Sequence, residues 1–196
     1  MNRKTGKKYS AIIEAAVKVF AENGYHNSQV SKIAREAGVA DGTIYLYFQN
    51  KEEILTSVFK VKMGDFIARV RLELEKHANP LEKLRQLIRM HFSIMEDDRN
   101  LALFMQIQLR QSHPSVRAAI AEPLREYFRL IEGLLTEGVA AGSFRPGLDV
   151  RLARQMTFGT IDEVVTCWIM SRKEYRLTAQ VEGVLELLSH GLSARI

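Results

Sequence analysis

Residues 21–55 read AENGYHNSQVSKIAREAGVADGTIYLYFQNKEEIL, and this stretch decides the fold of the amino-terminal part of the chain. The pair Asn23-Gly24 predicts the end of a first helix, because glycine readily adopts the left-handed backbone that closes a helix. A short second helix is predicted to start after Ser28 and to stop at Gly38. With Asp41 as its cap, a third helix is predicted over 42–48. Two helices joined by so tight a turn are typical of a helix-turn-helix, here over about residues 28–48.

The third predicted helix has the composition expected of a helix that enters the major groove of B-DNA. In a helix-turn-helix the second helix lies in the groove with its amino end foremost, and the first helix braces it against the backbone. Small and polar groups at residues 40–43, followed by Tyr45, are placed to meet base edges. The remaining polar groups are placed to bond phosphates, directly or through backbone N–H groups at helix starts. The predicted DNA-binding residues are Ser28, Gln29, Ala40, Asp41, Gly42, Thr43, Tyr45, Tyr47 and Lys51.

A second interpretation of the same residues involves no DNA. The tyrosines would then pack in the core, and Lys51 would be a solvated residue at a helix start. Ile44 and Phe48, four residues apart, already supply a core face for the third helix, which leaves Tyr45 facing elsewhere. Asn50 and Glu53 form a capping box for a long fourth helix that is predicted to run to about His77.

Composition places the chain among globular, helical proteins. It has 196 residues, of which 46% are hydrophobic and 26% charged, and apolar residues recur at helical spacing in about nine segments. One cysteine, Cys167, excludes an intramolecular disulfide, and the amino-terminal residues show no signal-peptide pattern. No uninterrupted apolar run reaches the roughly 18 residues that a membrane span needs. We therefore expect an all-α cytoplasmic protein that does not span a membrane.

The positive charge is concentrated at the amino end. The net charge is +5, and residues 1–51 hold eight Lys or Arg against four Asp or Glu. Such an excess favours binding of a polyanion such as nucleic acid by counterion release, although solubilising charge would give the same pattern.

The stretch 21–55 resembles the DNA-binding domain of the TetR family of transcriptional repressors. The residues in register with the family are Gly24, Tyr25, Ile33, Ala34, Ala37, Gly38, Val39, Thr43, Tyr45, Tyr47, Phe48, Asn50 and Lys51. The resemblance continues through QLRQSHPSVR (108–117) and LDVRLARQMTFGTIDEVVTCWIM (148–170). In these later stretches the chain is similar to the family members that respond to acyl-CoA and repress fatty-acid degradation.

The resemblance implies a domain organisation and a mode of action. It implies a three-helix DNA-binding domain at residues 1–50 and a larger effector-binding and dimerisation domain at 51–196. It also implies a homodimer on palindromic operator DNA upstream of β-oxidation genes, which leaves the DNA when a long-chain acyl-CoA binds. The last two predicted helices, about 150–170 and 178–194, carry wide apolar faces that suit a four-helix dimer interface.

The larger domain contains residue types that could line an acyl-CoA site. Methionine and phenylalanine provide a flexible apolar lining for an acyl chain, although ordinary cores use the same residues and that interpretation is the commoner one. Arginine suits the phosphates, although most helical arginines are merely solvated. The predicted effector-binding residues are Met63, Phe66, Met90, Phe92, Phe104, Met105, Gln108, Phe128, Met156, Arg89, Arg110 and Arg129.

Patterns of enzymes and of metal sites are missing from the sequence. The five histidines include no His-x-x-x-His pair, and Cys167 lies in an apolar run without an adjacent histidine. We therefore predict no catalytic site, no metal and no cofactor. Asp162 and Glu163 interrupt an apolar stretch, and either fix the dimer register or bind a polar group of the ligand. Two alternatives remain: a repressor that responds to another lipophilic ligand, of the multidrug type, and a helical lipid carrier or enzyme whose basic amino end is incidental.

Overall fold

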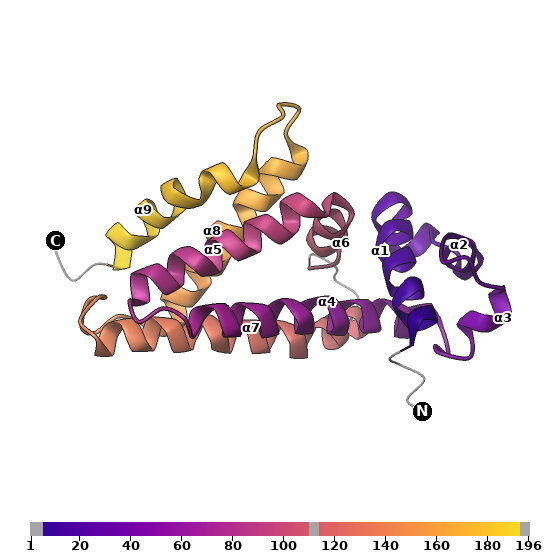
Figure 1. Cartoon of the computed structure of the whole chain (residues 1–196), viewed down its shortest axis with the longest axis horizontal. Helices are drawn as coiled ribbons and strands as arrows, with labels where there is room; N and C mark the ends of the chain where they lie inside the picture. The colour runs from indigo at the N-terminus through magenta and orange to yellow at the C-terminus, as the bar shows by residue number, and fades with distance from the viewer. Residues whose placement is uncertain (1–5, 110–113, 193–196) are drawn as a thin grey trace. The chain divides into compact units, whose positions relative to one another are not determined.

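The computed structural model of the chain describes residues 6–109 and 114–192, without the side chains of 108, 109, 114–116 and 119. Over those residues it has nine α-helices, one 3-10 turn and no strand, which confirms the all-α class (Figure 1). The elements are α1 (Lys7–Asn27), α2 (Val30–Glu36), α3 (Asp41–Ile44), α4 (Lys51–Leu74), α5 (Pro80–Asp97), α6 (Arg99–Leu109), α7 (Pro114–Ala140), α8 (Val150–Met170), the 3-10 turn η2 (Leu177–Gln180) and α9 (Val181–Leu192).

The helices form two compact units. Unit 1 holds α1, α2, α3, the part of α4 up to Gly64, α6 from Asn100, and the part of α7 up to Pro123. Unit 2 holds α5, α8, η2, α9 and the remainders of α4 and α7. The sequence predicted a division by function, into a DNA-binding domain up to residue 50 and an effector-binding domain after it. That division stays a prediction. Helices α4 and α7 divide between the units, and α6 contributes its first residue, Arg99, to unit 2.

Unit 1 has an aromatic core. Phe104 of α6 lies with its ring centroid 6.0 Å from that of Phe20 on α1 and 5.0 Å from that of Phe59 on α4. At the amino end of α1, Tyr9 stacks on Phe48 with a centroid separation of 5.4 Å. These buried rings join α1, α4, α6 and the segment after α3, which are far apart in the sequence.

The helix ends follow the capping residues that the sequence contains. Gly24 has φ 70° and breaks the regular part of α1 where the Asn23-Gly24 pair predicted the helix to end, but helical turns continue to Asn27. Asn50 accepts a hydrogen bond from the backbone N–H of Glu53 (2.8 Å), and the Glu53 carboxylate accepts one from the N–H of Gln49 (2.7 Å), which completes the predicted capping box. Asn79, followed by Pro80, caps α5 by accepting hydrogen bonds from the backbone N–H groups of Leu81 and Glu82.

The third helix is shorter than predicted. The structure has α-helix only over Asp41–Ile44, whereas the sequence predicted 42–48. Beyond Ile44 the backbone continues in turns, with the N–H groups of Leu46 and Tyr47 donating to the carbonyls three residues earlier. The turns allow Tyr47 and Phe48 to reach Tyr9, whose ring lies against both.

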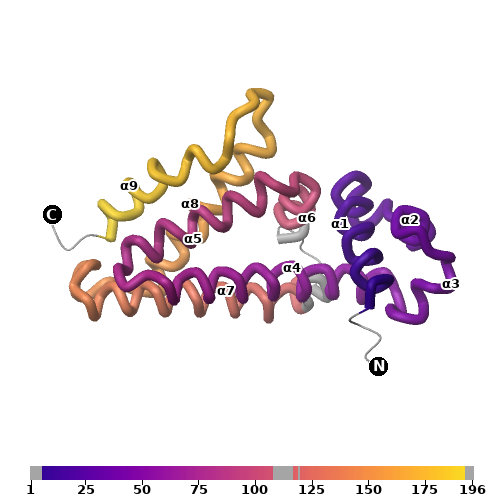
Figure 2. The backbone as a smooth tube through the Cα atoms, viewed as in Figure 1, coloured from indigo at the N-terminus to yellow at the C-terminus, as the bar shows by residue number. Residues whose placement is uncertain are grey.

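Unit 2 is organised around α5, which contacts α8, η2 and α9; Figure 2 traces the chain through these elements. The end of α7 folds back on itself. Gly142 has φ 69°, and the N–H groups of Ser143 and Phe144 both donate to the carbonyl of Gly138. The Phe144 ring is buried directly over Gly138, where a Cβ atom would lie 2.0 Å from the ring. Only glycine fits beneath this ring.

We predict that Gly138→Ala strongly destabilises the fold, while Gly133→Ala on the same helix does not. The new methyl group at 138 collides with the buried ring of Phe144, and such overpacking costs about 1–3 kcal/mol. At Gly133 an added Cβ meets nothing within 4 Å, and alanine favours the helix by about 0.5–1 kcal/mol. Urea denaturation of both variants measures the difference. Equal stability of the two variants would contradict the packing described for Phe144.

Candidate functional site

Helices α2 and α3 and the turn between them have the geometry of a helix-turn-helix. Gly38 has φ 66°, and the N–H of Val39 donates to the carbonyl of Ala34 (3.0 Å), so the chain reverses directly behind α2. Ile44, the last residue of α3, is fully buried, and it fixes one side of this helix against the core. The opposite side is open to solvent: Tyr45 is 60% exposed, and Asp41 and Gly42 are exposed at the amino end of the helix.

Seven of the nine predicted DNA-binding residues lie at this accessible surface. Those exposed are Gln29, Ala40, Asp41, Gly42 and Tyr45, while Thr43 and Tyr47 are half-buried. They come from the start of α2, the turn, α3 and the residues after it. The residues at the start of α3 are thus accessible to a partner, as major-groove recognition by a helix-turn-helix requires.

Ser28 belongs to the interior of unit 1. Its side chain is buried, and its hydroxyl lies within hydrogen-bond distance of the carbonyl oxygens of Val19 (3.1 Å) and Gly24 (2.6 Å). The one hydroxyl proton is shared between these two acceptors, and the Val19 carbonyl also accepts a hydrogen bond from Asn23 Nδ2 (2.9 Å). Its backbone N–H also bonds within the chain, to the carbonyl of Tyr25 (3.4 Å).

Lys51 also makes its contacts inside unit 1. Its Nζ donates to the backbone carbonyls of Tyr25 (2.8 Å), Ser28 (3.0 Å) and His26 (3.1 Å). It lies 4.6 Å from the centroid of the Tyr25 ring, and burial lowers the pKa of the ammonium group below its ordinary value. An ammonium group has three donors, and all three have acceptors here. In this arrangement Lys51 holds the start of α4 to the end of α1.

The predicted effector residues divide between the two units. Phe104 and Met105 are buried in unit 1, and Met63 is half-buried there, one residue before the boundary. The side chain of Gln108 and the whole of Arg110 lie outside the described residues. The predicted residues of unit 2 are Phe66, Arg89, Met90, Phe92, Phe128, Arg129 and Met156.

Two of the unit 2 residues, Phe66 and Phe128, belong to a cluster of rings around a buried polar pair. His91 Nδ1 lies 3.0 Å from the hydroxyl of Tyr127, and Phe66 packs edge-on against both rings, with centroids 5.5 and 5.4 Å away. Phe158 extends the cluster from Tyr127 to Phe128. Burial lowers the pKa of His91 to about 4 and raises that of Tyr127, so both are neutral at neutral pH. Sequence reasoning missed His91 and Tyr127, because no spacing links them across 36 residues.

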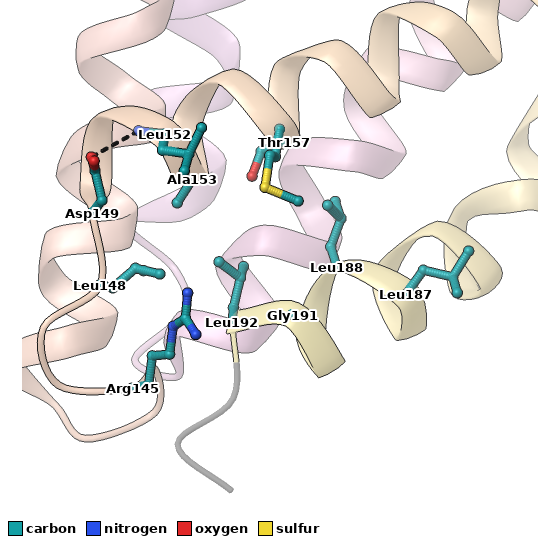
Figure 3. Close-up of a pocket in the computed structure, with 11 residues that line it drawn as sticks. Arg145, Leu148, Asp149, Leu152, Ala153, Thr157, Leu187, Leu188, Gly191 and Leu192 are labelled. Atoms are coloured by element: carbon teal, nitrogen blue, oxygen red, sulfur yellow. Dashed lines mark hydrogen bonds between the residues drawn. The ribbon is translucent and has the colours of Figure 1, made fainter. Parts of the chain in front are cut away.

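Met156 lies on a different surface, between α8 and α9. It is 58% exposed, and Leu152 on α8 and Leu187 on α9 are 53% and 74% exposed. Figure 3 shows Leu188 and Leu192 of α9 pointing toward α8, where Ala153 and Thr157 lie opposite. Large exposed apolar side chains gathered on one face are typical of an interaction surface. We call Leu152, Met156 and Leu187 the α8–α9 face.

The two predicted effector arginines that lie in unit 2, Arg89 and Arg129, differ in their surroundings. Arg89 is exposed and lies 3.5 Å from the carboxylate of Glu182. Arg129 lines a hollow together with residues of α4, α5 and α7.

Over the residues that the structure describes, no group of three histidine, cysteine or carboxylate side chains could hold a metal ion. No helix in that part of the chain is long and apolar enough to cross a membrane.

Comparison with known proteins agrees with this geometry over nearly the whole chain. The family model described as "Bacterial regulatory proteins, tetR family" matches residues 12–58. A second model, "YsiA-like protein, C-terminal region", matches residues 59–191. The first match contains α2, the turn and α3, and the second contains the ring cluster and the α8–α9 face.

Individual relatives are similar over the same length. The fatty acid metabolism regulator protein of Bacillus subtilis is 56% identical over 185 residues, which are 94% of this chain and 95% of that protein. The crystal structure of FadR from B. subtilis in complex with stearoyl-CoA, also 56% identical, has a TM-score of 0.90 and covers 94% of this chain and 99% of that one. FadR from Bacillus halodurans, 52% identical, has the same TM-score and coverage. These relatives are regulators rather than enzymes.

We predict that Lys51→Met lowers the free energy of unfolding. Methionine keeps the apolar stem but removes the ammonium group from three carbonyl acceptors, which costs about 1–3 kcal/mol when they lose their partner. Lys60→Met is the control, because Lys60 lies on the same helix and is exposed. Thermal unfolding of both variants, followed by circular dichroism, measures the effect. Unchanged stability of Lys51→Met together with lost DNA affinity would assign Lys51 to phosphate binding instead.

Proposed function

Since the chain belongs to the TetR family of DNA-binding regulators, we propose that it represses fatty-acid degradation genes and is released from its operator by long-chain acyl-CoA. The observation that carries this proposal is identity of 56%, over 94% of the chain, with a fatty acid metabolism regulator. FadR of Bacillus subtilis, which has the same fold as this chain, has been crystallised with stearoyl-CoA. A protein with this function works on chromosomal DNA, so we place it in the cytoplasm.

The DNA-binding surface is proposed to be the exposed side of α2, the turn and α3. Residues 40–43 and Tyr45 would meet base edges in the major groove, while Gln29, Thr43 and Tyr47 would bond phosphates. Phosphate roles for Ser28 and Lys51 remain predictions from the sequence, since their side chains have partners within unit 1. A two-fold symmetric pair of such surfaces reads a palindrome with half-sites about one helical turn apart.

The homodimer is proposed to form through the α8–α9 face. Its exposed leucines and methionine lie on the last two long helices, and two copies of this helix pair form a four-helix interface in which the same patch meets itself. Burying one exposed leucine of this size contributes about 1.5–3 kcal/mol.

The effector site is proposed to include the ring cluster of unit 2. Phe66, on α4, and Phe128, on α7, offer apolar surface for an acyl chain, and His91 and Tyr127 place a neutral polar pair among the rings. An effector releases DNA only by binding the DNA-free state more tightly than the DNA-bound state.

We predict that the protein binds a palindromic operator and that stearoyl-CoA weakens this binding by about 5- to 150-fold, the usual range of coupling between two sites. Fluorescence anisotropy with labelled promoter DNA, with and without stearoyl-CoA, measures this factor. Free stearate serves as the control ligand, and Tyr45→Ala, at the exposed residue directly after α3, serves as the control for sequence-specific binding.

Three outcomes separate the possibilities. Release by stearoyl-CoA, with reduced operator preference in Tyr45→Ala, supports the proposal. Operator binding that ignores stearoyl-CoA but responds to other lipophilic compounds favours a multidrug-type effector. Absence of salt-dependent binding to any palindrome contradicts the repressor function and leaves a lipid carrier.

We predict that Leu187→Asp converts the dimer to monomers, because each interface then buries two carboxylates in place of two leucines. Leu72→Asp is the matched control: Leu72 on α4 is 64% exposed, close to the 74% of Leu187, but lies outside the α8–α9 face. Sedimentation equilibrium determines the masses. A Leu187→Asp variant that stays dimeric would rule out this face as the interface.

A further inference from the structure

Leu46, two residues after the end of α3, is an exposed apolar side chain in a part of the chain that buries its other side chains of this kind. Its side chain is 60% exposed. Every other isoleucine, leucine and phenylalanine between residues 6 and 64, a range that the structure describes throughout, is buried. The exposure of Leu46 is therefore a local feature and does not reflect a generally apolar surface of unit 1.

The turn after α3 determines which way Leu46 faces. Its N–H donates to the carbonyl of Thr43 (3.2 Å), so the chain continues beyond α3 in a tight helical turn. Ile44 and Phe48, two residues before and two residues after Leu46, are both buried and hold this turn on the core of unit 1. Since the turn is fixed on both sides, Leu46 stays at the surface.

Leu46 lies on the same side of the chain as residues proposed to meet base edges. In a helical turn, side chains three and four residues apart are neighbours, which places Leu46 beside Gly42 and Thr43. Gly42 is exposed, and a Cβ atom added there would meet nothing within 4 Å, so the space at this position is open. Tyr45, the preceding residue, is also 60% exposed. Leu46 thus adds an apolar side chain to the surface formed by α2, the turn and α3.

The chemistry of leucine limits what this side chain can recognise on DNA. Leucine has no hydrogen-bond donor for a phosphate oxygen, so it adds no such bond to the DNA backbone. Among the base edges of the major groove, thymine presents an apolar group, its C5-methyl. Against the polar edges of guanine, adenine or cytosine, the same side chain would cover donors and acceptors without pairing them, which is unfavourable. Leucine on a groove-facing surface therefore favours thymine over the other bases.

We propose that Leu46 is a specificity-determining residue that contacts the C5-methyl group of one thymine in each operator half-site. This inference rests on the proposed DNA-binding surface and adds to it a residue that reads a base without a hydrogen bond. In a two-fold symmetric dimer, the two copies of Leu46 select thymines at symmetric positions of the palindrome. Because the contact is apolar, it contributes to sequence preference and leaves the salt-dependent binding of phosphates unchanged.

The test removes the methyl group from the DNA and the leucine from the protein in one set of measurements. The probe is a palindrome that the wild-type protein selects from random double-stranded DNA. Its thymines are replaced, one symmetric pair at a time, by deoxyuridine, which pairs in the same way but lacks the methyl group. Fluorescence anisotropy at a fixed salt concentration measures each affinity. At the pair of thymines that Leu46 contacts, the wild type is expected to lose about 15-fold in affinity, from roughly fourfold for each methyl group.

The Leu46→Ala variant is expected to lose its sensitivity at this one pair of positions. There it should bind the thymine and the deoxyuridine operators equally, and it should respond to every other replacement like the wild type. The dependence of its affinity on salt concentration should also be unchanged, because no phosphate contact is removed. Leu46→Met, which keeps an apolar side chain of similar size, should retain the thymine preference.

The matched control is Leu72→Ala, because Leu72 has a similar exposed fraction, 64%, but belongs to unit 2. It should give the wild-type result for every replacement. The proposal is overturned if Leu46→Ala and the wild type respond alike to all deoxyuridine replacements. It is also overturned if Leu46→Ala weakens binding to all DNA equally or alters the salt dependence, since a structural role would do so.

Two further results have other meanings. Unchanged responses to deoxyuridine, together with less cooperative binding of a second dimer to the operator, would overturn the proposal and make Leu46 a contact between proteins. Failure of the wild type to select any palindrome would overturn the repressor function itself, which is a different result from the loss of one base contact.

Discussion

The contact on which the rest of the structure depends is that of the Lys51 ammonium group with the carbonyl end of α1. Helix α1 ends at Asn27, so its last carbonyls lack helical donors, and an unpaired carbonyl in a partly buried place is costly. Lys51 and Ser28 supply the missing donors. Because Lys51 is also the first residue of α4, one side chain fixes where α1 ends and where α4 begins. The helix pair α2–α3, which lies between them in sequence, is held at both ends.

Helix α4 connects the Lys51 contact with unit 2. Its first residue holds the segment that leads into the DNA-binding helices, and its later residues, Phe66 and Arg71, line the ring cluster and the hollow of unit 2. Helices α4 and α7, which divide between the units, have Gly64 and Pro123 at the boundary. Glycine weakens a helix and proline removes one of its backbone hydrogen bonds, so bending is easiest at these points.

Local chemistry could be predicted from the sequence, but contacts between distant segments could not. The glycine breaks, the capping box of Asn50 and Glu53, and the helix-turn-helix follow from residues within a few positions of one another, and the structure contains all three. Lys51 was assigned to phosphate from its place at a helix start, because nothing in the sequence links it to carbonyls 23 to 26 residues earlier. Phe104 was grouped with the effector residues for its type alone, yet its ring packs on α1 in unit 1. The pair His91 and Tyr127 was missed for the same reason, because the sequence does not show which distant residues pack together.

The central claim is that operator DNA and acyl-CoA bind to two states of one protein, joined through α4. Thermodynamic linkage makes this coupling reciprocal: operator DNA must weaken stearoyl-CoA binding by the same factor by which stearoyl-CoA weakens operator binding. The most direct measurement is the dissociation constant of stearoyl-CoA by calorimetry, with and without saturating operator. The account predicts a loss of affinity within about 5- to 150-fold that equals the loss measured for DNA. An affinity for stearoyl-CoA that operator DNA leaves unchanged would contradict it.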